Sequence, residues 1–220
     1  MADTAIFDVD GTLVDTNYQH ALAWYQAFRR HDITLPVWRL HRAIGMGGDQ
    51  LVAHVAGDDV EKRLGEDLRQ AWEEEFDGMI DSVAAFEGAR ELLAEVKDRG
   101  FRLVLASSGK KKHVEHFLDL IGGTDVADAW TTSEDAEASK PAPDLVQVAL
   151  EKAEGKDAVM IGDSTWDAIA AGKADIPTIA VRTGGFSVEE LTEAGAVAVV
   201  ESLPDLRDGL DDGPLNRPTR

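Results

Sequence analysis

Two aspartates, separated by a single residue, follow a short apolar run near the start of the chain. Asp8 and Asp10 lie in residues 7–12, Phe-Asp-Val-Asp-Gly-Thr. A carboxylate in such a position can act as a nucleophile toward phosphorus. A second carboxyl group close by can protonate the leaving oxygen and afterwards activate water. The pair therefore predicts covalent and acid–base chemistry at the end of one apolar segment.

Other chemistry-bearing side chains also follow apolar runs. Ser107 comes directly after residues 101–106, and Lys140 follows a polar loop beyond residues 129–132. Asp163 comes after residues 157–161, and Asp167 lies one helical turn further on. Ligands bind at the carboxyl edge of an open parallel sheet. We therefore expect these four residues to meet the two aspartates at one edge.

Carboxylates that converge on one point repel each other unless a cation neutralises them. Magnesium prefers oxygen ligands and retains bound water, so Mg²⁺ is the expected cofactor. The predicted metal set is Asp8, Asp10, Asp163 and Asp167. Ser107 and Lys140 would hold the oxygens of a phosphoryl group, since charge stabilisation is the main task in phosphoryl transfer.

The segments that must position these side chains alternate between strand and helix patterns. Predicted strands cover residues 4–9, 101–106, 129–132, 157–161, 177–181 and 196–200. Predicted helices cover residues 88–99, 111–121 and 166–174, and another begins near Pro141 and Pro143. This order predicts an α/β fold, a Rossmann-like parallel sheet with helices on both faces.

An all-helical block interrupts the alternation between the first and second predicted strands. Within it, Trp24, Tyr25, Phe28 and Trp72 recur at helical spacing, which predicts an apolar core. Glycines at positions 45, 47 and 48 indicate a turn between helices. We expect a Rossmann-like core at 1–14 and 84–210, an inserted all-helical domain at 15–83, and a flexible tail at 211–220.

The composition narrows the possible partners. The formal net charge is -20, from 42 acidic and 22 basic side chains. Such a surface repels nucleic acid and anionic membranes, so we expect neither as a partner. No run approaches 18 apolar residues and no basic leader precedes the first strand, so we expect no membrane span and a cytoplasmic location. The acidity fits either solubility or a salt-rich habitat.

The chemistry-bearing residues form four motifs in a familiar order. Residues 8–12 resemble the first motif of the haloacid dehalogenase superfamily, and Ser107 resembles the second. Lys140 with Pro141 resembles the third motif, and residues 162–167 resemble the fourth. The helical block is similar to the helical cap of the phosphoglycolate phosphatase and beta-phosphoglucomutase subgroup.

The resemblance implies a role for each motif residue. Asp8 would be nucleophile and metal ligand, and Asp10 would be general acid and base with its backbone carbonyl on the metal. Asp163 would be the remaining protein ligand, with Asp167 close to the metal, while Ser107 and Lys140 would bind phosphate. Candidate substrate contacts are Ser108 and Gly109 in the second motif, and His20 and Gly48 in the cap.

The favoured activity is that of a magnesium-dependent phosphatase, which hydrolyses a small phosphorylated metabolite through an aspartyl-phosphate. A sugar-phosphate mutase is the main alternative, although residues 44–49 offer no cation for a second phosphate. A 2-haloacid dehalogenase fits less well because of Asp10 and the acidic fourth motif, and a non-catalytic binding protein fits less well because both Asp8 and Asp10 are present. A sugar phosphate, a nucleotide and a two-carbon acid remain open as substrates, with residues 106–110 favouring a sugar phosphate. Monomer and dimer also remain open.

Overall fold

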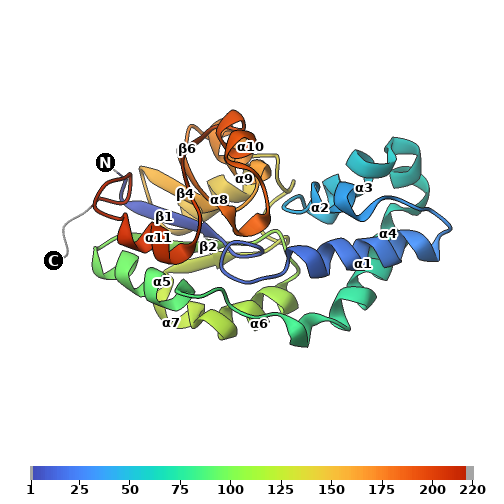
Figure 1. Ribbon diagram of the computed structural model, residues 1–220, viewed down its shortest axis with the longest axis horizontal. Helices are drawn as coiled ribbons and strands as arrows, with labels where there is room; N and C mark the ends of the chain where they lie inside the picture. Colours follow the sequence, from blue (N-terminus) through green and yellow to red (C-terminus); the bar gives the residue numbers. More distant parts are fainter. Residues whose placement is uncertain (1, 217–220) are drawn as a thin grey trace.

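A single parallel sheet forms the centre of the protein (Figure 1). The computed structural model describes residues 2–216, and over this range the sheet has the strand order β3-β2-β1-β4-β5-β6. The strands are β1 (Thr4–Asp8), β2 (Arg102–Ala106), β3 (Ala129–Thr131), β4 (Ala158–Gly162), β5 (Thr178–Val181) and β6 (Ala196–Val200). The strand order places β1 between β2 and β4, so the residues that follow these three strands share one edge.

Helices cover both faces of the sheet, as predicted. Side chains alternate between the two faces of a strand, so Phe7 packs toward α5, α6 and α11, while Ile6 packs toward α8 and α9. Both residues are fully buried, which explains the continuous apolar run of β1. The core helices are α5 (Ala89–Asp98), α6 (Lys111–Ile121), α7 (Gly123–Val126), α8 (Asp144–Lys152), α9 (Thr165–Lys173), α10 (Val188–Glu193) and α11 (Leu203–Asp208), with a short 3-10 helix, η2 (Arg182–Gly184).

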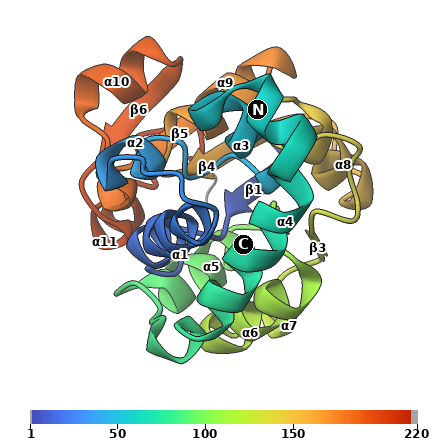
Figure 2. The same ribbon diagram turned by 90° about the vertical axis from the view of Figure 1, so that its right-hand side faces the viewer.

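The helical block lies over the end of the sheet at which β1 finishes (Figures 1 and 2). Its elements are α1 (Asn17–Arg30), α2 (Val37–His41), α3 (Gly48–Ala56), α4 (Asp58–Asp77) and the 3-10 helix η1 (Ile80–Ser82). The block has an apolar core of its own, in which Trp24 and Phe28 are buried and Trp72 packs at the margin. The chain enters and leaves the block side by side, since Asp15 N donates to Ala84 O at 2.9 Å.

Ion pairs join the helical block to the core along one side. Glu73 and Asp77 of α4 both pair with Lys112 of α6, at 2.7 and 2.6 Å. His113 Nε2 lies 2.7 Å from Asp77, and Lys110 pairs with Glu73. Each pair at the surface contributes little to stability. Together they hold α4 beside the loop that follows β2.

The described part of the expected flexible tail, residues 211–216, contacts the core at two residues. Leu215 is buried in the core beside α11, and Asp211 pairs with Arg99 at 2.7 Å. Leu215 and the ion pair of Asp211 therefore attach this segment to the core, while residues 211–213 and 216 are exposed and 217–220 lie outside the described residues. Within 2–216, no helix is both long and apolar enough to cross a membrane.

The separate apolar core of the helical block allows a stability test. Leu68 of α4 is fully buried, so Leu68→Ala should lower the free energy of unfolding by about 2–5 kcal/mol. Urea unfolding followed by the fluorescence of the block's tryptophans measures this change. Leu22→Ala is the matched control, since Leu22 is 44% exposed. Equal effects of the two changes would contradict the packing described for α4.

Candidate active site

The turn after β1 places two carboxylates at the edge of the sheet. Asp8 is the last residue of β1, and Asp10 follows it before a tight turn at Gly11. Gly11 has a φ of +81°, and a Cβ there would lie 2.4 Å from Asn17 Nδ2 and 2.6 Å from Asp163 Oδ2. Only glycine fits this position, because both the backbone angle and the close contacts exclude a side chain.

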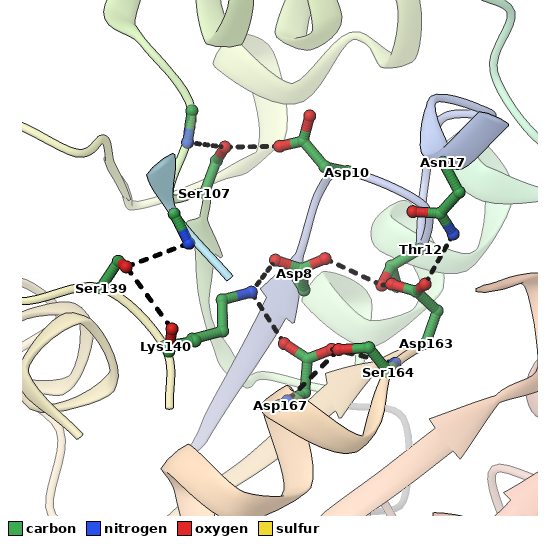
Figure 3. Close-up of polar contacts among 12 residues, drawn as sticks. Asp8, Asp10, Thr12, Asn17, Ser107, Ser139, Lys140, Asp163, Ser164 and Asp167 are labelled. Atoms are coloured by element: carbon green, nitrogen blue, oxygen red, sulfur yellow. Dashed lines mark hydrogen bonds and ion pairs between the residues drawn. The ribbon is translucent and has the colours of Figure 1, made fainter. Parts of the chain in front are cut away.

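A buried ammonium group joins three of the elements that form the site (Figure 3). Lys140 is 1% exposed, and its Nζ donates to Asp8 Oδ1 and, at 2.7 Å, to Asp167 Oδ1. Burial alone would lower the pKa of Lys140, but the charges of Asp167 and Asp8 outweigh it and raise the pKa. Lys140 therefore remains charged and offsets two buried carboxylates.

A second set of hydrogen bonds fixes the carboxylate that follows β4. Thr12 Oγ1 donates to Asp163 Oδ1 at 2.8 Å, and Asn17 Nδ2 donates to Asp163 Oδ2 at 2.9 Å (Figure 3). Thr12 Oγ1 also lies 3.1 Å from Asp8 Oδ2. Asn17 is the first residue of α1, so the helical block itself contributes to the fixing of this carboxylate.

Three buried carboxylates lie close enough together to share a cation. Oxygens of Asp8, Asp163 and Asp167 all lie within 4.8 Å of one another. Burial and the charge of Asp167 raise the pKa of Asp163 to about 7, and burial with the neighbouring aspartates raises the pKa of Asp8 well above its usual value. A divalent cation would relieve this crowding, and three carboxylate oxygens suit a hard metal. The residues present thus fit a magnesium ion.

The side chain of Asp10 points away from this triad. Ser107 Oγ donates to Asp10 Oδ2 at 2.6 Å, and His20 Nε2 lies 3.0 Å from Asp10 Oδ1. Burial by itself would raise the pKa of Asp10, but the hydrogen bonds and charges around it, those of His20 first, hold the pKa below its usual value. Asp8 and Asp10 therefore occupy electrostatically different environments, although they are separated by a single residue.

The residues expected to contact the substrate lie together. His20, Gly48, Ser108 and Gly109 all line a small pocket of about 60 Å³ that also includes Asp8, Asp10 and Lys140. His20 makes two contacts in this pocket. Its ring stacks on that of Phe76, with the ring centroids 4.0 Å apart, and its Nε2 lies within hydrogen-bond distance of Asp10. The pattern of apolar and polar residues in α1 did not indicate that contact.

Several polar residues that support the site were not singled out from the sequence. Thr12 and Asn17 hold Asp163, and Ser164 Oγ donates to Asp167 at 2.6 Å. Ser139 Oγ accepts from Gly47 N at 3.0 Å and donates to Asp49 at 2.5 Å, which ties the loop before Lys140 to the helical block. Thr12 and Ser164 lie next to motif aspartates in the sequence, and this proximity could have indicated their contacts with the site. Nothing in the sequence marks the contacts of Asn17 and Ser139.

This geometry agrees with the family to which the sequence is similar. A family model for haloacid dehalogenase-like hydrolases matches residues 5–181, which include every catalytic and metal-binding candidate. The chain belongs to the haloacid dehalogenase-like hydrolase family. This confirms the resemblance drawn from the four motifs.

Similar members of this hydrolase family are known by sequence and by structure. The validoxylamine A 7'-phosphate phosphatase of Streptomyces hygroscopicus subsp. limoneus is 27% identical, over 94% of this chain and 97% of its own. The pyrophosphatase PpaX of Oceanobacillus iheyensis is 26% identical, over 92% and 94%. The crystal structure of a hydrolase from Pseudomonas syringae is 30% identical, with a TM-score of 0.89 over 95% of this chain and 98% of that one.

The ammonium group at the centre of the site can be tested through stability. Lys140→Met leaves Asp8 and Asp167 buried without their cation, so it should lower the free energy of unfolding by about 3–5 kcal/mol. Urea unfolding in metal-free buffer measures the effect. Lys62→Met, which changes an exposed lysine of α4, should alter stability far less. A Lys140→Met variant as stable as the Lys62→Met variant would refute the compensating role of Lys140.

Proposed function

We propose that this hydrolase is a magnesium-dependent phosphatase that acts on a small phosphorylated metabolite through an aspartyl-phosphate on Asp8. The observation that carries the proposal is that two neighbouring carboxylates have separate sets of partners. Asp8 lies against Lys140 and the aspartate triad, while Asp10 has separate partners in Ser107 and His20. The names of the two sequence relatives, a phosphatase and a pyrophosphatase, support transfer of a phosphoryl group.

The first step joins Asp8 to phosphorus. An oxygen of Asp8 attacks, the bond between phosphorus and the leaving oxygen breaks, and Asp10 gives its proton to that oxygen. The low pKa of Asp10 belongs to the site without substrate, and a bound phosphate dianion raises it through like-charge repulsion. Lys140 holds the non-reacting phosphoryl oxygens.

The second step releases phosphate, frees the carboxylate of Asp8 and returns a proton to Asp10. Asp10, now deprotonated, takes a proton from water, and that water attacks the phosphorus of the aspartyl-phosphate. Its hydrogen bonds from Ser107 and His20 keep Asp10 directed at the pocket in both steps. The helical block covers the pocket and limits the entry of bulk water.

Magnesium would be held by Asp8 and Asp163, with Asp167 beside them and the backbone carbonyl of Asp10 as a further ligand. When bound, it supplies positive charge that lets a phosphate dianion approach in spite of the net charge of -20. The raised pKa of Asp163, about 7, supports this assignment because it reflects carboxylates crowded without a cation.

Phosphatase activity is tested with p-nitrophenyl phosphate and acetyl phosphate. We expect release of phosphate in the presence of Mg²⁺, its loss in EDTA, and its recovery when excess Mg²⁺ is restored. Asp8→Asn should abolish turnover, because the amide is a poor nucleophile. Asp98→Asn, an exposed aspartate of α5, serves as control and should leave the rate unchanged. Full activity of the Asp8→Asn variant would exclude the nucleophile assignment.

His20 should act as a positioning residue through Asp10. His20→Phe keeps a ring that can stack on Phe76 but removes the hydrogen bond to Asp10. We expect kcat/KM, which reports the first step, to fall about tenfold or more for an alkyl phosphate, whose leaving oxygen needs a proton. The loss should be smaller for p-nitrophenyl phosphate, whose leaving group is stable as an anion. Equal losses on both substrates would contradict a role through Asp10.

A further inference from the structure

A second cavity of about 260 Å³ lies beside the pocket of the nucleophile. Gly48, Trp72 and Ser108 line both spaces, so the two lie side by side. The smaller space, about 60 Å³, contains Asp8 and Lys140 and suits the phosphoryl group itself. A substrate whose phosphorus lies at Asp8 would therefore extend its leaving group into the larger cavity.

The size of the second cavity limits the leaving group. Pockets for drug-sized ligands measure about 300–1,000 Å³, and this cavity lies just below that range. One six-membered ring or a short open-chain polyol matches this volume.

The cations beside the second cavity are already paired with acids of the helical block. Arg69 Nη1 donates to both carboxylate oxygens of Glu61, at 2.9 and 3.1 Å, and to Gly48 O at 3.2 Å. Lys110 forms an ion pair with Glu73. A second phosphate would have to compete with these carboxylates for both cations.

Two further carboxylates line the same cavity. Asp49 accepts from Ser139 Oγ and Ser139 N, and Glu137 is exposed on the loop that precedes Lys140. Each carboxylate can accept about four hydrogen bonds, so both have capacity for substrate hydroxyls. The same groups repel an anion at short range.

From these observations we infer that the second cavity binds the uncharged, polyhydroxylated leaving group of a monophosphate, and that Asp49 and Glu137 disfavour substrates with a second anionic group. The inference rests on the phosphatase function proposed above and narrows its substrate class. A sugar or polyol monophosphate suits both spaces, whereas the two acids disfavour a bisphosphate or a diphosphate.

Phosphate release from a panel of substrates, with Mg²⁺ present, tests the substrate class. The panel contains acetyl phosphate, glucose 6-phosphate, sorbitol 6-phosphate, glycerol 1-phosphate, glucose 1,6-bisphosphate, pyrophosphate and adenosine 5'-monophosphate. We expect kcat/KM for the best neutral polyol monophosphate to exceed that for the bisphosphate and pyrophosphate by about 100-fold. A preference for the bisphosphate, pyrophosphate or the nucleotide overturns the inference.

A change of charge at Glu137 tests whether this carboxylate disfavours substrates with a second anionic group. Glu137→Gln keeps the size of an exposed side chain and removes its charge, so folding is not at stake. We expect the ratio of kcat/KM for glucose 1,6-bisphosphate to that for glucose 6-phosphate to rise about tenfold. Glu134→Gln, on the same loop but outside the lining of this cavity, should leave the ratio unchanged.

The outcomes separate this inference from the proposed function. An enzyme that fails to hydrolyse even acetyl phosphate would contradict the phosphatase function and, with it, this inference. An enzyme that hydrolyses acetyl phosphate but treats monophosphates and bisphosphates alike would overturn the inference alone. An unchanged ratio in the Glu137→Gln variant would also overturn it.

Discussion

The ammonium group of Lys140 lies between two buried carboxylates, and the site depends on that contact. Taking a charge out of water costs several kcal/mol, and only close opposite charges and hydrogen bonds offset it. Lys140 meets Asp8 at the end of β1 and Asp167 on α9, so it joins the loop before α8 to two other elements. The third carboxylate, Asp163, depends on Thr12 and Asn17 instead, and the crowding that remains is what a metal ion would relieve.

The helical block is more than a cover for this site. Its first helix supplies Asn17 to Asp163 and His20 to Asp10, so two carboxylates of the sheet edge receive hydrogen bonds from the block. A motion that lifted α1 would break both contacts. The ionised forms of both carboxylates therefore depend on contacts made by α1.

The sequence predicted the sheet, and the edge at which its polar side chains meet, because parallel strands bring their carboxyl ends to one place whatever lies between them. Asp8, Ser107 and Asp163 could be assigned from strand ends alone. Contacts such as Asn17 with Asp163 span 146 residues and depend on how the helical block sits, which no local pattern encodes. Arg69 was missed for the same reason, since its partners Glu61 and Gly48 meet only once α3 and α4 pack. The short helices α7, α10 and α11 contain too few residues to show a clear helical period of apolar side chains, so they could not be predicted from the sequence.

The central claim is that Asp8 carries the phosphoryl group during turnover. Mixing the enzyme with acetyl phosphate and Mg²⁺, quenching in acid within the first turnover and mapping the peptides by mass spectrometry tests it most directly. We expect a phosphorylated peptide from the β1 region, with the modification on Asp8 and its loss on treatment with neutral hydroxylamine. Modification of Asp10 or another residue instead, or turnover without any phosphorylated enzyme in rapidly quenched samples, would contradict it.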